Sequence, residues 1–288
     1  MKIGFIGLGI MGSAMCANII HKHNDQVYVF DMDPLKTKHL ADEGGIACAS
    51  CRETAEKADL LITMVPKSIH VKAVMEEILP VLNSTKTWID MSTIEPAASV
   101  EISLKVKETG ASFLDAPVVK SRPAAEAGKL GIYVGGSEED FERVLPVLAY
   151  MGENIIRMGD NGKGLVMKIC HNALVSQIQN GVNETSLLAA ANGIDILTFA
   201  QAISYGGGQN FYLDSKKEVI AKEDYTTAFS VANMHKDVHI CLDLAKESGV
   251  YMPGEENAVA VYDEAMEKGF GSEDFSASIK AVKERKPC

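Results

Sequence analysis

Three glycines near the N-terminus constrain the fold of this chain more than any other feature. They form the pattern G-x-G-x-x-G, directly after the apolar run IGFI and directly before a helix-like stretch, in the order Gly7, Leu8, Gly9, Ile10, Met11 and Gly12. In this pattern the first glycine makes a tight turn, the second lets backbone approach a pyrophosphate, and the third lets helix and strand pack closely. Free N–H groups at the start of the helix then bind phosphate. The pattern predicts a dinucleotide site at residues 7–12 of an α/β domain.

Asp31 adds the second part of such a site. It ends the apolar stretch QVYVFD, about twenty residues after Gly12, where a carboxylate can bind the hydroxyls of the adenosine ribose. A carboxylate there repels a 2′-phosphate, and Met32 and Asp33 offer no arginine to accept one. NAD is therefore favoured over NADP, although the nearby Lys36 leaves use of NADP open.

Apolar runs alternate with helical patterns through the first half of the chain. This alternation is typical of a doubly wound parallel sheet, as in a Rossmann domain. Strands are predicted at Lys2–Ile6, Gln26–Phe30, Leu60–Met64, Thr87–Asp90, Ser112–Asp115 and Gly131–Val134, with helices at Met11–His21 and Pro34–Glu43. Beyond Gly164 the strand signal ends, and Leu165–Asn192 reads as one long helix. We expect a dinucleotide-binding domain (1–163), a connecting helix (164–193) and a small all-α substrate or oligomerisation domain (194–288).

Charge and cysteine usage exclude several classes of partner. A formal net charge of −11 argues against nucleic acid and anionic membranes, which bind through Lys and Arg. No apolar run is long enough to span a membrane, and the N-terminus lacks a signal-peptide cleavage site. The cysteines are scattered, as reduced thiols of a cytoplasmic enzyme would be, at Cys16, Cys48, Cys51, Cys170, Cys241 and Cys288. The Cys48–Cys51 spacing has no second pair. His235 and His239 are four residues apart and could share a helix face, but surface or supporting histidines are favoured over zinc ligands, so no metal site is expected.

The segment GDNGKGLVMKICHN, residues 159–172, carries the best candidate chemistry. Lys168 and Asn172 are four residues apart, so they share one face of a helix. Apolar neighbours would desolvate the lysine, and burial lowers the pKa of a lysine. Such an amine can take a proton from an alcohol as hydride leaves. From these residues alone, a snorkelling or salt-bridged structural lysine is the favoured interpretation.

The chain resembles the β-hydroxyacid dehydrogenases, the family of 3-hydroxyisobutyrate dehydrogenases, tartronate semialdehyde reductases and 3-sulfolactaldehyde reductases. The resemblance covers nearly the full length. It rests on ordered motifs, namely GFIGLGIMG, ITMVP at 62–66, DMSTIEP at 90–96, DAPV at 115–118, the 159–172 segment and FSVANMHKD at 229–237.

The resemblance implies a role for several residues. Lys168 matches the family's catalytic lysine, and Asn172 the asparagine that holds substrate beside it. Met64, Val65 and Pro66 match a loop against the cofactor, and Ser92 and Thr93 a turn near nicotinamide and substrate. Lys236 matches a lysine that reaches the cofactor from the C-terminal domain. The family also implies a homodimer or homotetramer.

One segment departs from the family pattern. Relatives commonly carry Ser-Gly-Gly after the Asp-x-Pro-Val, where this chain has Val119, Lys120, Ser121, Arg122 and Pro123. The two cations are either solvated loop charges or contacts to a demanding anion such as a sulfonate, a phosphate or a second carboxylate. The segment is similar to that of 3-sulfolactaldehyde reductases, so Ser92, Lys120, Ser121, Arg122 and Asn172 are the candidate substrate contacts.

These observations predict an NAD-dependent oxidoreductase acting on a small anionic β-hydroxyacid or its semialdehyde. Two alternatives remain open. An imine reductase would share the architecture but usually lacks a lysine at position 168. A non-catalytic NAD sensor would explain Gly7–Gly12 and Asp31, but it would not need Lys168, Asn172 and Lys236.

Overall fold

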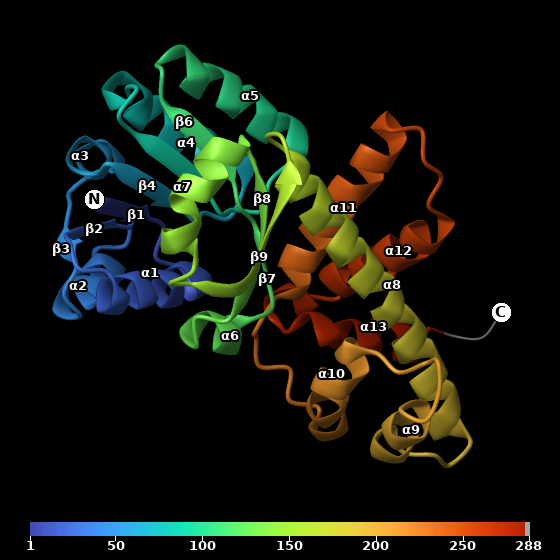
Figure 1. Cartoon of the computed structure of the whole chain (residues 1–288). Helices are drawn as coiled ribbons and strands as arrows, with labels where there is room; N and C mark the ends of the chain where they lie inside the picture. The colour runs from blue at the N-terminus through green and yellow to red at the C-terminus, as the bar shows by residue number, and fades with distance from the viewer. Residues whose placement is uncertain (286–288) are drawn as a thin grey trace. The chain divides into compact units, whose positions relative to one another are not determined.

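The computed structural model describes residues 1–285, and these form two compact units, 1–168 and 169 onward. The long helix α8 (Lys163–Ala191) is divided between them: its first six residues belong to the first unit. Cys288 lies outside the described residues. Figure 1 shows strands confined to the first unit and helices making up the second.

Within residues 1–285, nine strands form one sheet in the order β3-β2-β1-β4-β5-β6-β8-β7, with β9 paired to β8. The strands are β1 (Ile3–Ile6), β2 (Val27–Phe30), β3 (Ile46–Ala47), β4 (Leu60–Thr63), β5 (Thr87–Asp90), β6 (Ser112–Asp115), β7 (Val118–Val119), β8 (Leu130–Gly135) and β9 (Gly152–Gly159). The first six are parallel, and the chain reverses strand order between β1 and β4. In doubly wound sheets, ligands bind at the carboxyl ends of strands flanking such a reversal.

The predicted Rossmann fold is confirmed, and the six predicted strands match observed strands to within one residue at each end. Three strands were not predicted: β3, β7 and β9. β3 and β7 are only two residues long, too short to show a pattern. Among the described strands β9 pairs only with β8, and most of its residues are exposed or half-buried, so its sequence lacks a clear apolar run. The end of the sheet is also not parallel, since β8 runs antiparallel to β6 and β7.

Alternate residues of the central strands enter two different cores. Phe5, Ile62 and Ile89 pack on one face with Met15 and Ile19 of helix α1 (Ile10–Lys22). Ile6, Leu61 and Trp88 pack on the opposite face with residues of α4 (Ser68–Ile78) and α5 (Pro96–Glu108). Side chains of a strand point alternately to the two faces, and both faces are covered here, which explains the nearly continuous apolar runs such as LLIT.

The remaining helices of the first unit are short connectors. They are α2 (Pro34–Asp42), α3 (Cys51–Lys57), η1 (Leu79–Val81), α6 (Arg122–Glu126) and α7 (Glu138–Leu148). Several start at capping residues: Asp33 accepts the N–H of Leu35, and Ser50 accepts that of Glu53. These caps satisfy backbone donors that the first turn of a helix leaves free.

The second unit is helical. It contains the rest of α8 with α9 (Ile196–Ile203), α10 (Phe211–Lys222), α11 (Val231–Glu247), α12 (Pro253–Glu267), η2 (Phe270–Ser272), η3 (Phe275–Ala277) and α13 (Ser278–Glu284). Val231, Met234 and Val238 recur at helical spacing along α11, and they pack with Tyr262 and Ala265 of α12. The predicted helix Leu165–Asn192 agrees with α8 to within two residues at each end.

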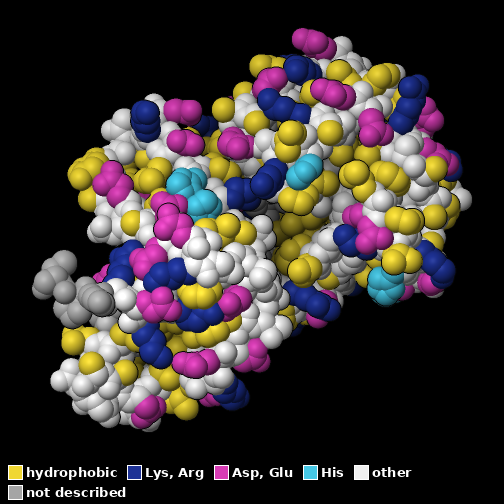
Figure 2. Space-filling model, turned by 180° about the vertical axis from the view of Figure 1, so that it is seen from behind, with side chains coloured by type: hydrophobic (Ala, Val, Ile, Leu, Met, Phe, Trp, Pro, Cys, Tyr) yellow, Lys and Arg dark blue, Asp and Glu magenta, His cyan; other side chains and the backbone are white. Residues whose placement is uncertain are grey.

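The charge on the surface and the apolar character of the helices agree with the composition. Figure 2 shows Lys and Arg side chains interspersed with Asp and Glu on the face in view, without a continuous basic area. Within residues 1–285, no helix combines the length and the apolar character that crossing a membrane requires.

Candidate active site

The glycine turn between β1 and α1 has the geometry that its pattern predicts. Gly7 has φ +94°, and a Cβ there would lie 2.3 Å from the carbonyl oxygen of Met64. A Cβ on Gly12 would lie 2.0 Å from the carbonyl oxygen of Gly7, whereas a Cβ on Gly9 would meet nothing within 4 Å. Gly7 and Gly12 are therefore required by the protein's own backbone. Gly9 instead leaves open space at the start of α1, which suits the close approach of a pyrophosphate.

Asp31 is held beside this turn at the end of β2. One carboxylate oxygen accepts the N–H of Leu8 at 2.7 Å, and the other accepts the N–H of Asp33 at 2.8 Å. The ammonium of Lys36 lies 3.8 Å from the same carboxylate. The side chain is 14% exposed, so it retains access for further hydrogen bonds. The turn and the carboxylate together fit a dinucleotide with a free ribose diol.

Ser92 joins the two loops that follow β4 and β5. Its hydroxyl accepts the N–H of Val65 at 2.9 Å and donates to Asp90 Oδ1 at 2.7 Å. Asp90 also accepts the hydroxyl of Thr63 at 2.7 Å, and Thr63 accepts the indole N–H of Trp88. Ser92 is only 1% exposed, so in this structure its hydroxyl fixes the loop of Val65.

Asp90 was not predicted as a site residue. Burial raises the pKa of its carboxyl to about 6, partly offset by the hydroxyls of Ser92 and Thr63. Its second carboxylate oxygen is buried without a hydrogen-bond partner. The available signal in the sequence was an aspartate that ends an apolar strand, the same position that Asp31 takes at the end of β2.

Asp115 fixes the start of the helix that carries Lys168. This buried side chain accepts the N–H of Gly162 at 2.6 Å and that of Leu165 at 3.0 Å. A Cβ on Gly135 would lie 2.5 Å from one carboxylate oxygen, and a Cβ on Gly164 would lie 2.8 Å from the other. The family motif DAPV pointed to this position, but its role depends on contacts almost fifty residues away in sequence.

Lys168 lies one turn beyond that cap and is buried, with 8% of its surface exposed. Asn172, one further turn along α8, donates from its amide to Asp237 Oδ2 at 2.6 Å. The other oxygen of Asp237 lies 2.9 Å from the ammonium of Lys236. The structure therefore links Asn172 and Lys236 through a carboxylate that is 2% exposed. Asp237 was seen in the sequence only as a neighbour of Lys236.

Lys120 and Arg122, the candidate anion contacts, have partners within their own unit. The ammonium of Lys120 donates to Glu153 at 2.9 Å and to the carbonyl of Lys129 at 2.7 Å. Arg122 pairs with Glu126, one turn along α6, at 2.7 Å. Ser121 is the N-cap of α6 and its side chain makes no capping hydrogen bond. Of the three side chains, only the hydroxyl of Ser121 has no carboxylate partner in these contacts.

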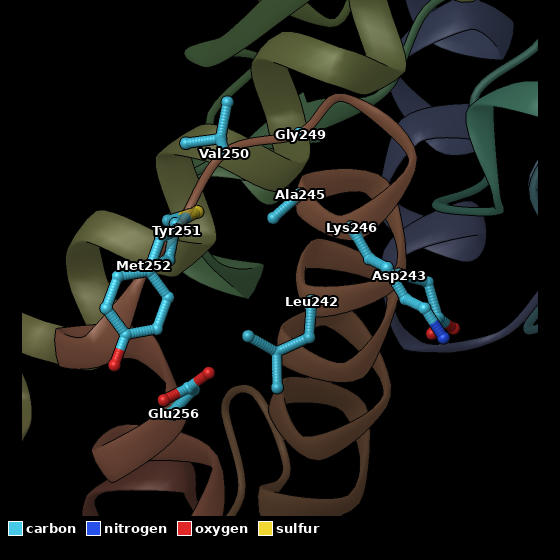
Figure 3. Close-up of a pocket in the computed structure, with 9 residues that line it drawn as sticks. All are labelled: Leu242, Asp243, Ala245, Lys246, Gly249, Val250, Tyr251, Met252 and Glu256. Atoms are coloured by element: carbon cyan, nitrogen blue, oxygen red, sulfur yellow. The ribbon is translucent and has the colours of Figure 1, made fainter.

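A hollow of about 450 Å³ lies in the helical unit, and none of these groups lines it. Figure 3 shows Tyr251 and Glu256 across from Leu242 of α11. Its lining residues are Leu242, Asp243, Ala245, Lys246, Gly249, Val250, Tyr251, Met252 and Glu256. None of these is a predicted site residue, so the hollow does not mark the catalytic site.

Two family models together match nearly the whole chain. Residues 2–159 match the NAD binding domain of 6-phosphogluconate dehydrogenase, and residues 162–282 match the NAD-binding domain described for NADP-dependent 3-hydroxyisobutyrate dehydrogenase. The chain is 33% identical to 2-(hydroxymethyl)glutarate dehydrogenase of Eubacterium barkeri, covering 97% of this chain and 94% of the relative. It is 32% identical to 2-hydroxy-3-oxopropionate reductase of Escherichia coli, covering 98% and 97%.

The chain belongs to the β-hydroxyacid dehydrogenase family. A solved structure of Mycobacterium tuberculosis 3-hydroxyisobutyrate dehydrogenase with L-serine superposes with a TM-score of 0.91 at 29% identity, covering 98% of this chain and 99% of that chain. An imine reductase from Pseudomonas sp. shares the fold with a TM-score of 0.66 at 20% identity, covering 98% and 99%.

The family and the glycine turn together establish the reaction class. The protein is an NAD-dependent oxidoreductase of the hydroxyacid dehydrogenase type, and its cofactor is a nicotinamide dinucleotide. The predicted enzyme class is thereby confirmed.

Proposed function

We propose that this β-hydroxyacid dehydrogenase uses Lys168 as the general acid/base in reversible oxidation of a small anionic β-hydroxyacid to its semialdehyde. The burial of Lys168 carries the proposal: the residue is only 8% exposed, so its amine is shielded from bulk water on the helix that Asp115 caps. Capping by Asp115 sets the helix that presents it. A positioned amine of this kind can transfer a proton in the transition state.

The chemistry divides between cofactor and side chains. A nicotinamide dinucleotide held at Gly7–Gly12 and Asp31 would supply the hydride acceptor for oxidation of the alcohol carbon and the hydride donor for the reverse reaction. The amine of Lys168 takes the hydroxyl proton during oxidation and returns it during reduction. Asn172 orients the substrate by hydrogen bonding while Asp237 holds its amide. Val65, held by Ser92, and the neighbouring Pro66 form the wall for the cofactor.

Asp31 supports NAD over NADP. Its carboxylate already accepts two backbone N–H groups beside the glycine turn, so it is fixed where a 2′-phosphate would be repelled. Replacing Asp31 with Ser removes this charge. We expect kcat/KM for NAD to fall at least tenfold while that for NADP rises; an unchanged ratio of the two values would contradict the preference.

For the substrate we propose a strongly anionic aldehyde, such as a sulfonated one, rather than a plain carboxylate semialdehyde. The departure of residues 119–123 from the family's Ser-Gly-Gly supports this, since Lys120, Ser121 and Arg122 place cationic and hydroxyl groups in one segment. The ion pairs to Glu153 and Glu126 weigh against it, because each cation must exchange a carboxylate for the substrate. Initial rates with 3-sulfolactaldehyde and with carboxylate semialdehydes decide between them; equal turnover would refute the sulfonate.

The proton role is tested by Lys168→Ala. We expect kcat to fall by about 10²–10⁴, the range for general acid–base catalysis, while NAD binding measured by fluorescence persists. Lys163→Ala, at the exposed start of the same helix, is the matched control and should retain kcat. Undiminished turnover of the Lys168 variant would remove the role. A parent protein that binds NAD but turns over no hydroxyacid would favour the sensor.

We further propose that the enzyme is a cytoplasmic homodimer or homotetramer. Leu174 and Leu188 of α8 are 60% and 65% exposed, and Leu197 of α9 is 42% exposed. A second copy of the helical unit would cover such side chains. Cys170 is exposed and free, which suits a reducing compartment. Light scattering after size exclusion measures the subunit number, and a monomer would contradict the assembly.

A further inference from the structure

Two helices of the second unit bring together three metal-ligating side chains that the catalytic proposal does not use. His235 and His239 lie one turn apart on α11, and Asp263 faces them from α12. The Nε2 atoms of the two histidines lie 2.9 Å and 2.8 Å from a single oxygen, Asp263 Oδ1. One ligand atom from each residue lies within 4.8 Å of the others. Within residues 1–285 this is the one such three-residue group.

We propose that His235, His239 and Asp263 form a binding site for a divalent transition metal ion, with zinc as the best match. Imidazole nitrogen and carboxylate oxygen are ordinary zinc ligands at about 2.0–2.2 Å. A tetrahedral ion with bonds of this length holds its ligand atoms about 3.3 Å apart. The present separations of 2.8–2.9 Å therefore need to increase by only about half an ångström.

The surroundings allow that movement. The side chains of His235, His239 and Asp263 are 30%, 44% and 44% exposed, so none is locked by complete burial. The ring centroids of the histidines are 4.4 Å apart, and both rings point their Nε2 atoms at the same carboxylate. The proton on each donating nitrogen can move to Nδ1 as the metal takes its place, because neutral imidazole has two tautomers. Three protein ligands leave the fourth position of zinc to water.

A second histidine pair in the same chain shows what the cluster adds. His21 and His39 both contact Glu43, but at 3.4 Å and 3.3 Å and through different carboxylate oxygens. Their side chains are 59% and 67% exposed. They do not form a compact three-ligand group. His21, His39 and Glu43 therefore serve as an internal control: they make histidine–carboxylate contacts, but their ligand atoms do not meet at one point.

The ion would join α11 to α12. α11 also carries Lys236 and Asp237, which the enzyme uses next to Asn172. A metal bound to His235 and His239 stabilises the folded state by mass action, because the ligands meet only when both helices are packed. The proposed role is structural support of this helix pair.

The test uses the full-length, tag-free protein after treatment with chelator. Cys170→Ser and Cys288→Ser are introduced in every sample, because free thiols bind the same metals. Cobalt(II) is titrated and its visible absorbance recorded, followed by displacement with zinc. We expect one equivalent of cobalt per chain with tetrahedral absorbance, and a higher Tm when zinc is present.

Variants decide whether these three residues bind the ion. His239→Gln and, separately, Asp263→Asn should weaken cobalt binding at least tenfold and abolish the zinc-dependent rise in Tm. His39→Gln should bind as the parent does. Tm in chelator shows that each variant is folded before titration. Absence of cobalt binding at 100 μM, or parent-like binding by both His239→Gln and Asp263→Asn, would overturn the proposal.

Discussion

The two units of the enzyme differ in what their buried polar groups hold. In the sheet unit, Asp90 and Asp115 each end a strand and accept hydrogen bonds from the turns and loops at that edge. In the helical unit, the buried polar groups instead join helices far apart in sequence, as Gln179 of α8 does with Ser278 of α13 at 2.5 Å. The first arrangement fixes the loops after β4 and β5 and the start of α8, which carries the proposed catalytic Lys168. The second fixes how the helices pack.

This difference predicts that substitutions at the sheet edge affect catalysis or NAD binding as well as stability, whereas substitutions in the helical network affect stability alone. Buried polar groups cost free energy when a partner is removed, in either unit. The two units differ in which element moves when a contact is lost: a loop or helix start at the sheet edge in the first unit, and a packed helix in the second.

The largest effect is expected at the glycine turn. Gly12→Ala places a Cβ about 2.0 Å from the carbonyl of Gly7, so β1 and α1 must separate. We expect a loss of about 2–4 kcal/mol in the free energy of unfolding, measured in urea, together with loss of NAD binding. Gly9→Ala, whose Cβ meets no protein atom within 4 Å, should keep stability and weaken only NAD binding. Equal destabilisation by both variants would show that Gly9, like Gly12, is needed for the packing of the protein itself and not only for NAD binding.

A smaller effect is expected at Asp115. Asp115→Asn replaces one acceptor oxygen with an N–H₂ group, which then faces the backbone N–H of Gly162 or Leu165. We expect a loss of about 1–3 kcal/mol in stability and a fall in kcat of roughly tenfold, since the helix carrying Lys168 loses part of its cap.

The control for Asp115 is a helix cap in the other unit. Asp195 accepts the N–H groups of Leu197 and Thr198 at the start of α9. Asp195→Ala should cost about 1 kcal/mol and leave kcat unchanged. If both variants lower kcat alike, the fall follows lost stability and Asp115 has no positioning role.

In the helical unit, replacing Glu255 should raise the stability of the protein, whereas the variants above lower it. Its carboxylate is fully buried, accepts hydrogen bonds from Ser176 and Gln177, and burial raises its pKa to about 7. The folded state therefore binds this proton more tightly than the unfolded state, and stability falls as pH rises from about 4.5 to 7. Glu255→Gln should remove this part of the slope and raise stability above pH 7, by roughly 1–3 kcal/mol.

Thermal unfolding of the Glu255 variant from pH 5 to 9 makes the measurement. Glu256→Gln, the exposed neighbour on α12, is the matched control and should follow the parent curve. A Glu255 variant less stable than the parent at pH 8 would show that the charged carboxylate is needed.

The sequence predicted the strands and the glycine turn of the sheet unit better than the contacts that support the site. The reason is that the former depend on local patterns, whereas the latter depend on residues far apart in sequence. Gly7, Gly9 and Asp31 lie in a local pattern whose spacing determines its geometry, so they could be assigned directly. The roles of Asp90, Asp115 and Asp237 depend on partners brought close by the fold. Asp263 is the clearest case: it lies 24 residues from His239 in sequence and completes a three-ligand group only because α11 packs on α12. Short edge strands such as β7 were missed because two residues carry no periodicity.

The smallest effect is expected at Lys120, where the substrate proposal and the backbone make separable predictions. Lys120 has φ +78°, a conformation that favours glycine, and it occupies the first glycine position of the family's Ser-Gly-Gly. Lys120→Gly relieves this strain and should change stability by less than about 1 kcal/mol, because the exposed ion pair with Glu153 contributes little. If Lys120 contacts the anion, KM for a sulfonated aldehyde rises at least tenfold in both Lys120→Gly and Lys120→Ala. Glu153→Gln, which releases the lysine, should then lower KM. Unchanged KM in all three variants would leave Lys120 as a surface charge and transfer the anion contact to Ser121.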